Sequence, residues 1–472
     1  MRLNHWNQAC AVVALLVAMA LALRAQTFTT LLSFDMSNGF RPDGALVQGT
    51  DGGLYGTTPN GGAHGAGNVF RVTPSGVTTV YSFCAQGTYP DCPDGSLPEG
   101  GLIQAVNGNF YGTTTYGGAN GAGSIFALSP SGALTTIYSF CVPSACGDGD
   151  WPIAGLIQAS SGELYGTTQY GGTPPIGNGG GTIFKVTPSG MFTTLYSFCV
   201  GGFPCADGQE PVAPLIQANN GDFYGPAGGT IFKITPAGTL TTLANGIGVV
   251  GPLVQGTDGN FYGTGFDEGV TNSNGAVFKI TPGGTVTTLY SFCLQDGCPD
   301  GASPSGGLVQ ATDGNFYGTT ENGGTNGSNR GTIFKITPSG ALTTLYSFCS
   351  QSKCTDGAGP YGPLVQATDG LLYGTTGSGG AKSYGVAFSV SLGLSPFVKT
   401  QPTSAHVGTA VKILGTDLGG ASSVTFNGTP AVFKVVSKSL ISTTVPAGAS
   451  TGTVQVVIPS GTLSSNLPFQ VR

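Results

Sequence analysis

Charged side chains and histidines are scarce in this chain of 472 residues. Only 8% of the residues are charged, and the sequence offers no catalytic or metal-ligating partner for His64 or His406. The 22 acidic residues outnumber the 16 basic ones, which gives a net charge of −6. This balance disfavours nucleic acid and anionic membrane surfaces as partners, and it favours cations or neutral ligands.

Long hydrophobic runs are also missing, apart from one near the N-terminus. Residues 11–23 are almost wholly apolar, but such a run is too short to span a bilayer comfortably. Arg2 precedes it and Ala25 offers a small residue for cleavage, as in a secretory signal peptide. We therefore predict a signal peptide over residues 1–25 and an exported mature chain, secreted or held in the cell envelope, without a membrane span. A retained membrane anchor is the alternative.

Glycine is abundant, with 82 residues, and a phrase built on a Tyr-Gly pair recurs seven times. The copies stand about 55 residues apart, a period typical of tandem units that bury their apolar faces against one another. We expect the seven tyrosines to pack between neighbouring units rather than to form a ligand cage. They are Tyr55, Tyr111, Tyr165, Tyr224, Tyr262, Tyr317 and Tyr373.

One full copy, residues 307–349, predicts four strands over residues 308–311, 315–320, 332–337 and 342–348, here called strands A to D. Asp313-Gly314 between A and B is a strong two-residue hairpin signal. A short Pro-Ser-Gly turn separates C from D. Four strands in about 50 residues, repeated around an axis, match one blade of a β-propeller.

The two ends of the repeat array complement each other. The seventh copy stops after residues 386–390 without a strand D, whereas residues 27–34 form an isolated strand D. We predict that this N-terminal strand pairs beside Phe388 and closes the last blade, which removes exposed sheet edges. The array then forms a seven-bladed β-propeller over residues 26–393, with a linear β-solenoid as the alternative.

Topology sorts the loops of such a ring between two rims. The A–B and C–D turns share the short-turn rim, while the B–C and D–A loops share the long-loop rim. We place 15 of the 22 acidic residues on the long-loop rim against four basic residues, Arg41, Arg330, Lys353 and Lys382. Function is commonly carried by variable loops on a rigid scaffold.

Ten cysteines form five close pairs, each directly after a strand D. Each pair offers two thiols and no histidine, whereas structural zinc requires four ligands. We predict local disulfides in an oxidising compartment, and zinc is the rejected alternative. The pairs are Cys84–Cys92, Cys141–Cys146, Cys199–Cys205, Cys293–Cys298 and Cys349–Cys354.

A C-x-D-G-x-x-P motif follows in the same five loops. Its aspartates are candidate calcium ligands, because Ca²⁺ takes six to eight oxygens. The alternative is that each Asp caps its own turn while Gly supplies a positive φ, and we expect no other cofactor. The aspartates are Asp94, Asp148, Asp207, Asp300 and Asp356.

A glutamine occupies one strand A position in every copy. The seven side chains either line the channel or pack as the repeat dictates. They are Gln48, Gln104, Gln158, Gln217, Gln255, Gln310 and Gln366.

The recurring segments DGNFYGTT, GTIFKITPSG and LTTLYSF resemble the GloVer-type tandem repeat of exported bacterial "choice-of-anchor" proteins. That resemblance covers roughly residues 27 to 390 and implies no known activity. Residues 394–472, with alternating apolar positions such as Val424 and Phe426, resemble an IPT/TIG domain. The expected fold class is therefore all-β: a seven-bladed propeller followed by an immunoglobulin-like β-sandwich.

No convergent catalytic cluster is visible in the sequence. The leading hypothesis is an exported, non-enzymatic binding or scaffold protein whose unidentified carbohydrate or protein ligand meets the long-loop rim. Tyr89, Trp151, Phe203 and Tyr361 add aromatic surface there. The alternative is a polysaccharide hydrolase or lyase with Asp148 and Asp150 as acid and base. A purely structural envelope component is a third possibility.

Overall fold

A computed structural model of the chain describes residues 26–73, 76–142, 145–173, 179–202, 204–249, 251–267 and 274–472. The signal peptide expected at residues 1–25 lies outside these ranges. The described residues are all-β, with two short 3₁₀ turns, η1 (Ser352–Cys354) and η2 (Leu418–Gly420), and no α-helix. None of their helical segments has the length and hydropathy needed to cross a membrane.

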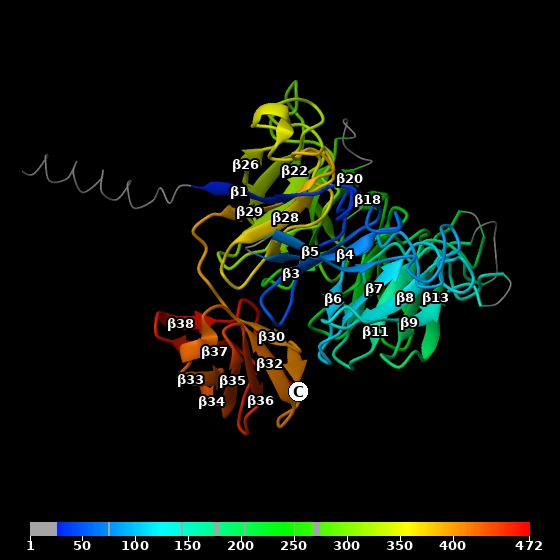
Figure 1. Cartoon of the computed structure of the whole chain (residues 1–472). Helices are drawn as coiled ribbons and strands as arrows, with labels where there is room; N and C mark the ends of the chain where they lie inside the picture. The colour runs from blue at the N-terminus through cyan, green and yellow to red at the C-terminus, as the bar shows by residue number, and fades with distance from the viewer. Residues whose placement is uncertain are drawn as a thin grey trace, which may run out of the picture.

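Residues 27–391 form a ring of antiparallel sheets, of which the described residues contain seven (Figure 1). The first sheet comprises β2 (Val47–Gln48), β3 (Leu54–Thr58), β4 (Asn68–Thr73) and β5 (Gly76–Ser82). The second comprises β6 (Ile103–Gln104), β7 (Phe110–Thr114), β8 (Ser124–Leu128) and β9 (Leu134–Ser139). The third comprises β10 (Ile157–Gln158), β11 (Leu164–Thr168), β12 (Thr182–Val186) and β13 (Phe192–Ser197).

The remaining sheets continue this pattern. The fourth comprises β14 (Ile216–Gln217), β15 (Phe223–Ala227), β16 (Thr230–Ile234) and β17 (Leu240–Asn245). The fifth comprises β18 (Ile247–Val249), β19 (Val254–Gln255), β20 (Phe261–Asp267), β21 (Ala276–Ile280) and β22 (Val286–Ser291). The sixth comprises β23 (Val309–Gln310), β24 (Phe316–Thr320), β25 (Thr332–Ile336) and β26 (Leu342–Ser347). The seventh comprises β27 (Val365–Gln366), β28 (Leu372–Thr376), β29 (Val386–Ser391) and β1 (Thr27–Ser33).

The sixth sheet shows how closely the sequence pattern predicts the strands. Its four strands coincide with the expected strands A to D to within one residue at most ends, and they pair in the order A-B-C-D. Gly314 in the A–B turn has a φ of +80°, which a glycine adopts without the clash of a Cβ. The all-β prediction is confirmed.

Strand β1 closes the seventh sheet, as the complementary ends of the repeat array predict. It runs antiparallel to β29, and Thr30 lies opposite Phe388 (Figure 1). Phe28 stacks on Tyr346 of the sixth sheet with ring centroids 4.0 Å apart, and it also packs against Phe388 at 5.3 Å. The N-terminal strand therefore joins the sheet and covers its outer edge.

The strand A glutamines connect each sheet to the next. In each pair of neighbouring sheets, the glutamine Oε1 of one sheet accepts a backbone N–H from the preceding sheet. The donor is the residue two positions after the glutamine of that preceding sheet. Gln48 completes the cycle by accepting the Thr368 N–H at 3.0 Å. The other six bonds, 2.8 to 3.0 Å long, join Gln104 to Thr50, Gln158 to Val106, Gln217 to Ser160, Gln255 to Asn219, Gln310 to Thr257 and Gln366 to Thr312.

The hydrophobic core lies between the sheets. Tyr55 of the first sheet packs on Phe110 of the second with ring centroids 4.2 Å apart, and Tyr262 packs on Phe316 at 4.0 Å. One buried cluster combines Ala387 of the seventh sheet with Leu54 and Phe70 of the first. The Tyr-Gly tyrosines are thus inter-sheet packing residues, and apolar burial is continuous across the junction where the ring closes.

The fifth sheet departs from the repeat. The short fourth copy lacks a cysteine pair, and the chain leaving β17 forms the extra strand β18 beside an extended β20. Val249 of β18 is buried and lies opposite Gly265. The extra strand lies on the long-loop rim, where the fourth copy has only a short connection to the fifth.

The C-terminal residues form two facing sheets around their own core, in which Ile413, Val424 and Ile441 are buried. One sheet comprises β30 (Lys399–Gln401), β32 (Ala410–Leu414), β36 (Leu440–Thr444) and β35 (Phe433–Ser437). The other comprises β34 (Thr429–Pro430), β33 (Ser423–Phe426), β37 (Val454–Ile458) and β38 (Gly461–Ser464), and β31 (Ser404–Ala405) pairs in parallel with β39 (Gln470–Val471). The domain boundary predicted at residues 393/394 falls between β29 and β30.

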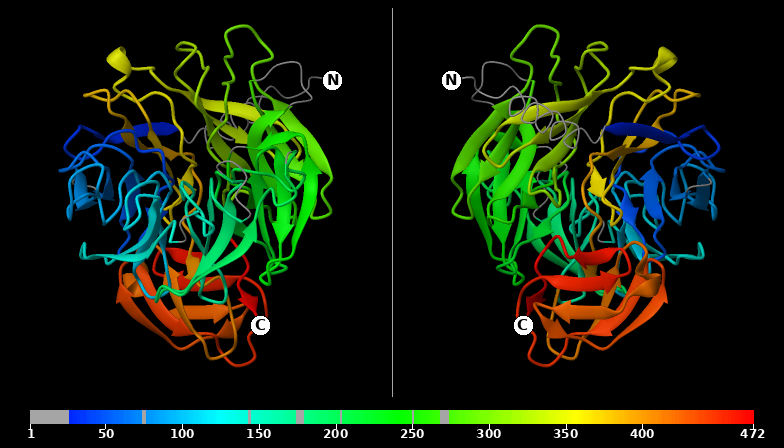
Figure 2. Two further views of the ribbon diagram at one scale, coloured as in Figure 1. Left: turned by 90° about the vertical axis from the view of Figure 1, so that its right-hand side faces the viewer. Right: turned by 90° about the vertical axis from the view of Figure 1, so that its left-hand side faces the viewer.

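This sandwich docks on the short-turn rim of the ring (Figure 2). Ser439 donates to the Thr50 carbonyl at 2.9 Å, and Lys412 donates to the Val106 carbonyl at 2.8 Å. Lys399 donates to the Gln366 carbonyl at 2.6 Å. The contacts involve the first, second and seventh sheets, so they span the junction closed by β1.

Candidate functional site

The long-loop rim brings together three carboxylates around one guanidinium. Arg41 and Asp43 precede β2, Glu99 precedes β6, Glu321 follows β24, and Tyr361 precedes β27. The Arg41 guanidinium lies 3.0 Å from the Asp43 carboxylate and 4.7 Å from the centre of the Tyr361 ring. The Tyr361 hydroxyl donates to Glu321 at 2.6 Å. We call these five residues, Arg41, Asp43, Glu99, Glu321 and Tyr361, the rim cluster.

Asp43 is the electrostatic centre of the rim cluster. Burial and the charges of Glu99 and Glu321 raise its pKa, Arg41 lowers it, and the net result is a pKa of about 7. Its Oδ1 is buried without a hydrogen-bond partner. Burial likewise raises the pKa of Glu99 above its ordinary value, and that of Tyr361 to about 12. The cluster therefore combines excess negative charge with one incompletely satisfied carboxyl group.

An aromatic row adjoins the cluster. Trp151, ahead of β10, packs edge-to-face between Tyr116 at 5.0 Å and Tyr170 at 5.1 Å. Tyr116 pairs with Ser96, three residues before Glu99, so the row adjoins the cluster. Burial raises the pKa of Tyr116, and the charge of Glu99 adds to the shift. All three rings are half-buried. Carboxylates that accept hydroxyl groups next to aromatic rings suit a polyhydroxylated ligand with an apolar face.

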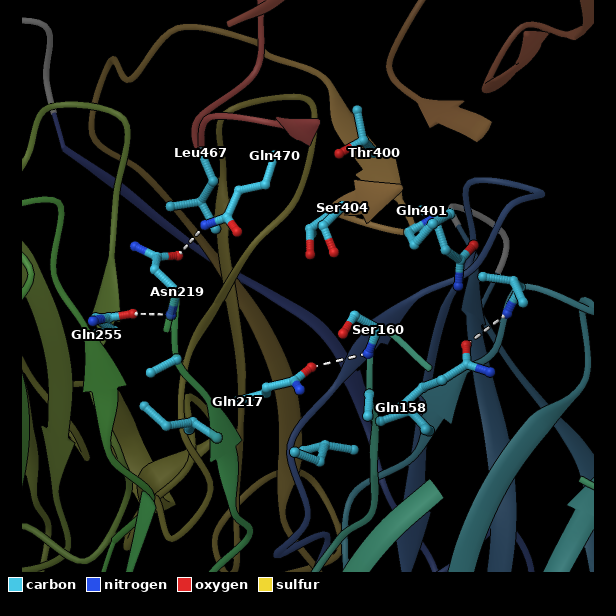
Figure 3. A pocket seen from close by; sticks show the side chains of 18 of the residues that line it. Gln158, Ser160, Gln217, Asn219, Gln255, Thr400, Gln401, Ser404, Leu467 and Gln470 are labelled. Atoms are coloured by element: carbon cyan, nitrogen blue, oxygen red, sulfur yellow. Dashed lines mark hydrogen bonds between the residues drawn. The ribbon is translucent and has the colours of Figure 1, made fainter. Parts of the chain in front are cut away.

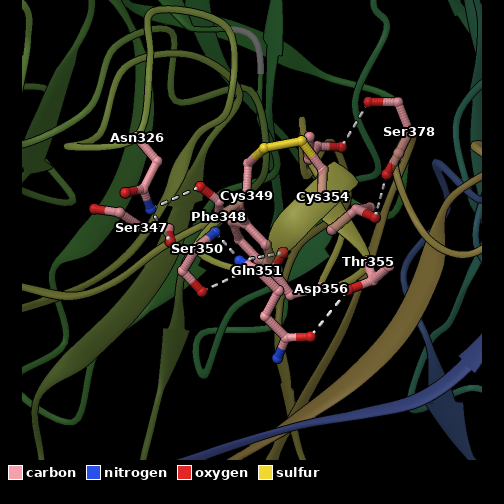
Figure 4. Close-up of a disulfide and its surroundings, with 12 residues drawn as sticks. Asn326, Ser347, Phe348, Cys349, Ser350, Gln351, Cys354, Thr355, Asp356 and Ser378 are labelled. Carbon is pink, nitrogen blue, oxygen red and sulfur yellow. Dashed lines mark hydrogen bonds between the residues drawn. A yellow bond between two sulfur atoms is a disulfide. The ribbon is translucent and has the colours of Figure 1, made fainter.

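The five motif aspartates have a structural role that differs from the turn cap expected in the alternative to calcium. Asp356 is fully buried, and its carboxylate accepts the Tyr346 hydroxyl at 2.7 Å and the N–H groups of Ser350 and Gln351 at 2.8 and 3.2 Å (Figure 4). The same pattern joins Asp94 to Tyr81, Asp148 to Tyr138, Asp207 to Tyr196 and Asp300 to Tyr290, at 2.7 to 2.8 Å. Each aspartate thus holds the cysteine loop against the end of strand D.

Five disulfides close the same loops, in the pairs anticipated from the sequence: Cys84–Cys92, Cys141–Cys146, Cys199–Cys205, Cys293–Cys298 and Cys349–Cys354. Figure 4 shows the Cys349–Cys354 bond directly beside Asp356. Glycine supplies a positive φ after each motif aspartate, for example +94° at Gly357. Calcium binding in these loops remains a prediction, and it would compete with the tyrosine and backbone donors.

The two carboxylates proposed for hydrolysis differ in their surroundings. Asp148 accepts the Tyr138 hydroxyl and the N–H groups of Cys141 and Val142, so its oxygens are occupied. Asp150 is half-buried, and burial raises its pKa. Its Oδ1 has no partner. The charge of Asp148 also raises the pKa of Asp150, and the acid and base roles of the two residues remain a prediction.

The remaining sequence candidates have different surroundings. Tyr89 is 57% exposed on the loop ahead of β6 and interacts electrostatically with Tyr116 of the row. Trp151 and Tyr361 lie in the site, and Phe203 is outside the described residues. The His406 ring bonds to the Arg472 carbonyl at 2.9 Å in the C-terminal domain. Among the described residues, no three histidine, cysteine or carboxylate side chains lie close enough to share a metal ion.

A hollow lies at the other end of the ring from the rim cluster, between the short-turn rim and the C-terminal sandwich (Figure 3). Its volume is about 870 Å³, and its lining includes Ile157, Gln158, Gln217, Gln255, Thr400 and Gln470. Four of the seven strand A glutamines line it, namely Gln104, Gln158, Gln217 and Gln255. Their amides are also bonded within the ring, for example Gln158 Nε2 to the Gly162 carbonyl at 3.0 Å. Gln470 on the sandwich donates to Asn219 at 2.7 Å across the hollow (Figure 3).

Sequence reasoning did not single out Glu99, Glu321, Tyr116 or Tyr170 as site residues. These four residues lie on three different sheets, but Tyr116 and Tyr170 hold the same place in the recurring segment Tyr-Gly-Thr-Thr-x-Tyr-Gly-Gly. One sequence signal for this part of the rim was the position of a residue within its repeat. Arg41, Trp151 and their counterparts in other copies each precede a proline ahead of strand A. Aligning the copies on that proline would have collected the residues at this part of the rim.

Comparison with known families assigns both parts of the chain. The model described as "Gloeobacter/Verrucomicrobia repeat" matches residues 17–227, 177–299 and 227–429. The chain belongs to the Gloeobacter/Verrucomicrobia repeat family. A model of the IPT/TIG domain matches residues 397–471, so this member of the repeat family carries an IPT/TIG domain at its C-terminal end. A comparison with curated proteins gave no match.

Several solved structures resemble this repeat protein at low identity. A streptogramin B lyase structure is 17% identical, with a TM-score of 0.48, and the match covers 78% of this chain and 99% of that one. The extracellular domain assigned to a one component system of B. thetaiotaomicron is 13% identical, with a TM-score of 0.49. That match covers 95% of this chain but 58% of the other. A luciferin-regenerating enzyme is 11% identical, with a TM-score of 0.41 over 79% of this chain and 98% of that one.

Proposed function

We propose that this repeat protein is an exported, non-enzymatic binding protein that holds a carbohydrate on its long-loop rim. The observation that carries the proposal is the aromatic row beside the rim cluster. Aromatic faces cover the apolar side of a sugar ring, and carboxylates accept its hydroxyl groups. The excess of acidic groups on this rim disfavours a polyanionic ligand such as nucleic acid.

Export is the second part of the proposal. It is supported by five disulfides, which are typical of proteins that fold in oxidising compartments. It is also supported by the residues expected to form a signal peptide. Fractionation of cells that express the full chain should find it outside the cytoplasm and shortened at its N-terminus. A cytoplasmic, full-length product would contradict this part.

A glycan array with the mature chain tests the binding function, followed by calorimetry on any hit. We expect binding to neutral oligosaccharides, and we expect the double variant Asp43→Ala/Glu99→Ala to lose at least about tenfold in affinity. Asp296→Asn is the matched control, because Asp296 is an exposed carboxylate on the same rim outside the cluster. An array without a hit would remove the carbohydrate proposal and favour a protein ligand.

One observation favours hydrolysis as a second candidate function. The pKa of Asp43 is raised to about 7, which suits a general acid, and Glu99 and Glu321 are nearby carboxylates. A hydrolase of this kind would turn over a bound polysaccharide near pH 6, and Asp43→Asn would abolish turnover while retaining binding. Binding without turnover by the unmodified chain would eliminate this candidate.

A further inference from the structure

One position on the long-loop rim has the same unusual backbone in six of the sheets. It is the residue directly before a buried proline ahead of strand A, and its φ lies between +49° and +60°. A positive φ is uncommon for residues other than glycine, and a residue before proline is normally extended. We call this set the pre-proline ring: Arg41, Leu97, Trp151, Glu210, Ser303 and Gly359.

The backbone of the pre-proline ring explains this conformation. Each member donates its N–H to a carbonyl on a B–C loop of the preceding sheet. Leu97 donates to Ala66 at 2.9 Å and Ser303 to Asn274 at 2.7 Å, and corresponding bonds join Arg41 to Tyr384, Trp151 to Ala122, Glu210 to Gly180 and Gly359 to Arg330. Four members also accept an N–H from the residue after strand B of their own sheet, as Leu97 does from Thr115 at 3.0 Å. Main-chain atoms thus link the sheets here.

Because the main chain makes these links, the side chain is free to vary. The prolines that follow are all buried and constant, whereas the ring positions hold Arg, Leu, Trp, Glu, Ser and Gly. Arg41 enters the rim cluster and Trp151 forms the middle of the aromatic row. Leu97, Glu210 and Ser303 hold the equivalent position in their own copies, and they are partly exposed on the rim.

We infer that the pre-proline ring is the set of specificity-determining positions of the rim site. In this assignment Trp151 and Leu97 contact the apolar face of a neutral sugar ring, and Arg41 and Glu210 select its polar substituents. The framework of main-chain bonds and prolines is common to the copies, so ligand preference is set by the five side chains of the ring and by the space left at Gly359. This inference depends on the carbohydrate-binding function proposed above.

The test uses the mature chain and the neutral oligosaccharide that binds best on the glycan array. Trp151→Ala should weaken binding by at least about tenfold, and Trp151→Phe should retain most of it because a ring remains in the row. Leu97→Glu should change the order of preference on the array. Thermal unfolding of Leu97→Glu should stay close to that of the unmodified chain, because its main-chain bonds are retained. Met191→Ala, an exposed residue on the short-turn rim, is the control.

The outcomes separate the two proposals. If Asp43→Ala/Glu99→Ala abolishes binding while Trp151→Ala and Leu97→Glu leave affinity and array preference unchanged, the rim binds carbohydrate and the specificity assignment is wrong. A large loss of thermal stability in Leu97→Glu would show that the side chain is structural and would also overturn the assignment. If the unmodified chain binds no glycan, the proposed function fails and the inference fails with it.

Discussion

The motif aspartates have the composition of a set of calcium ligands, but in the structure they fix the cysteine loops to strand D through hydrogen bonds. Each carboxylate accepts a tyrosine hydroxyl from strand D and N–H groups from the cysteine loop that follows. Charged acceptors of this kind form strong hydrogen bonds, and leaving the donors unpaired is costly. The aspartate and the disulfide therefore hold the same loop by independent means.

Asp148→Asn should lower the free energy of unfolding by about 1–2 kcal/mol, because an amide oxygen satisfies fewer of the three donors than a carboxylate does. Urea unfolding of both forms, followed by tryptophan fluorescence, measures the change. Asp91→Asn is the matched control, since Asp91 is exposed in another loop of the same rim. Equal losses of stability in the two variants would contradict the role of Asp148 in fixing the cysteine loop.

Asp43 should make stability depend on pH in the opposite sense to an ordinary surface carboxylate. Its pKa is about 7 in the folded chain and 3.8 ordinarily, so between about pH 4 and pH 7 only the unfolded chain has released the proton. The free energy of unfolding should therefore fall as the pH rises through this window. Asp43→Asn should flatten the dependence and be the more stable form at pH 8. Parallel urea titrations at pH 5 and pH 8 test this, and an unchanged pH slope in the variant would refute it.

At the residue scale, the sequence predicts what lies within one repeat better than what lies between repeats. The cysteine pairs and the glycine turns are local, so spacing alone locates them. The bond from Asp148 to Tyr138 was detectable in principle, because a tyrosine about ten residues upstream recurs in all five loops. Glu99 and Glu321 both act on Asp43 only because the ring brings distant copies together, and no local pattern marks them.

At the scale of elements, the strand pattern was predictable because every copy repeats the same alternation of apolar residues and the same turn signals. The missing strand D of the seventh copy and the extra one at residues 27–34 predicted the pairing of β1 with β29. Strand β18 was not predicted, since Ile247–Val249 is too short to stand out and pairs only where β20 is extended.

Phe28→Ala should destabilise the chain by about 2–3 kcal/mol, less than for a fully buried phenylalanine because Phe28 is half-buried. The loss arises because its ring fills the space between Tyr346, Phe348 and Phe388. Thermal unfolding is the measurement. Leu31→Ala on the same strand is the control, as Leu31 is 36% exposed and should cost much less. A larger effect in the control would contradict the closure role of Phe28.

At the scale of the whole molecule, the IPT/TIG domain bonds to sheets on both sides of the ring closure. Lys399 donates to Gln366 in the seventh sheet, and Ser439 donates to Thr50 in the first. The domain therefore acts as a clamp between the seventh and first sheets, which come from opposite ends of the repeat array. The sequence predicted both domains, but their docking depends on single polar contacts that have no sequence signature.

Lys399 provides a pH test of this clamp. Burial lowers its pKa to about 8, from an ordinary value of 10.5. From about pH 8 to pH 9.5 the folded chain has released a proton that the unfolded chain keeps, so the free energy of unfolding should rise. Lys399→Met should remove this rise. The window stops there because buried tyrosines, such as Tyr55 with a pKa of about 12, lower stability above about pH 10. A rise that persists in Lys399→Met would point to another group.

The pairing of β1 with β29 also determines the order in which the ring can form during synthesis. The ribosome delivers β1 first and β29 only after nearly all of the ring, so an early strand must stay available while every later sheet forms. A contact of such long range closes slowly, and a lone strand edge can meanwhile join another nascent chain. Products cut short before residue 386 would keep that edge open and available for aggregation.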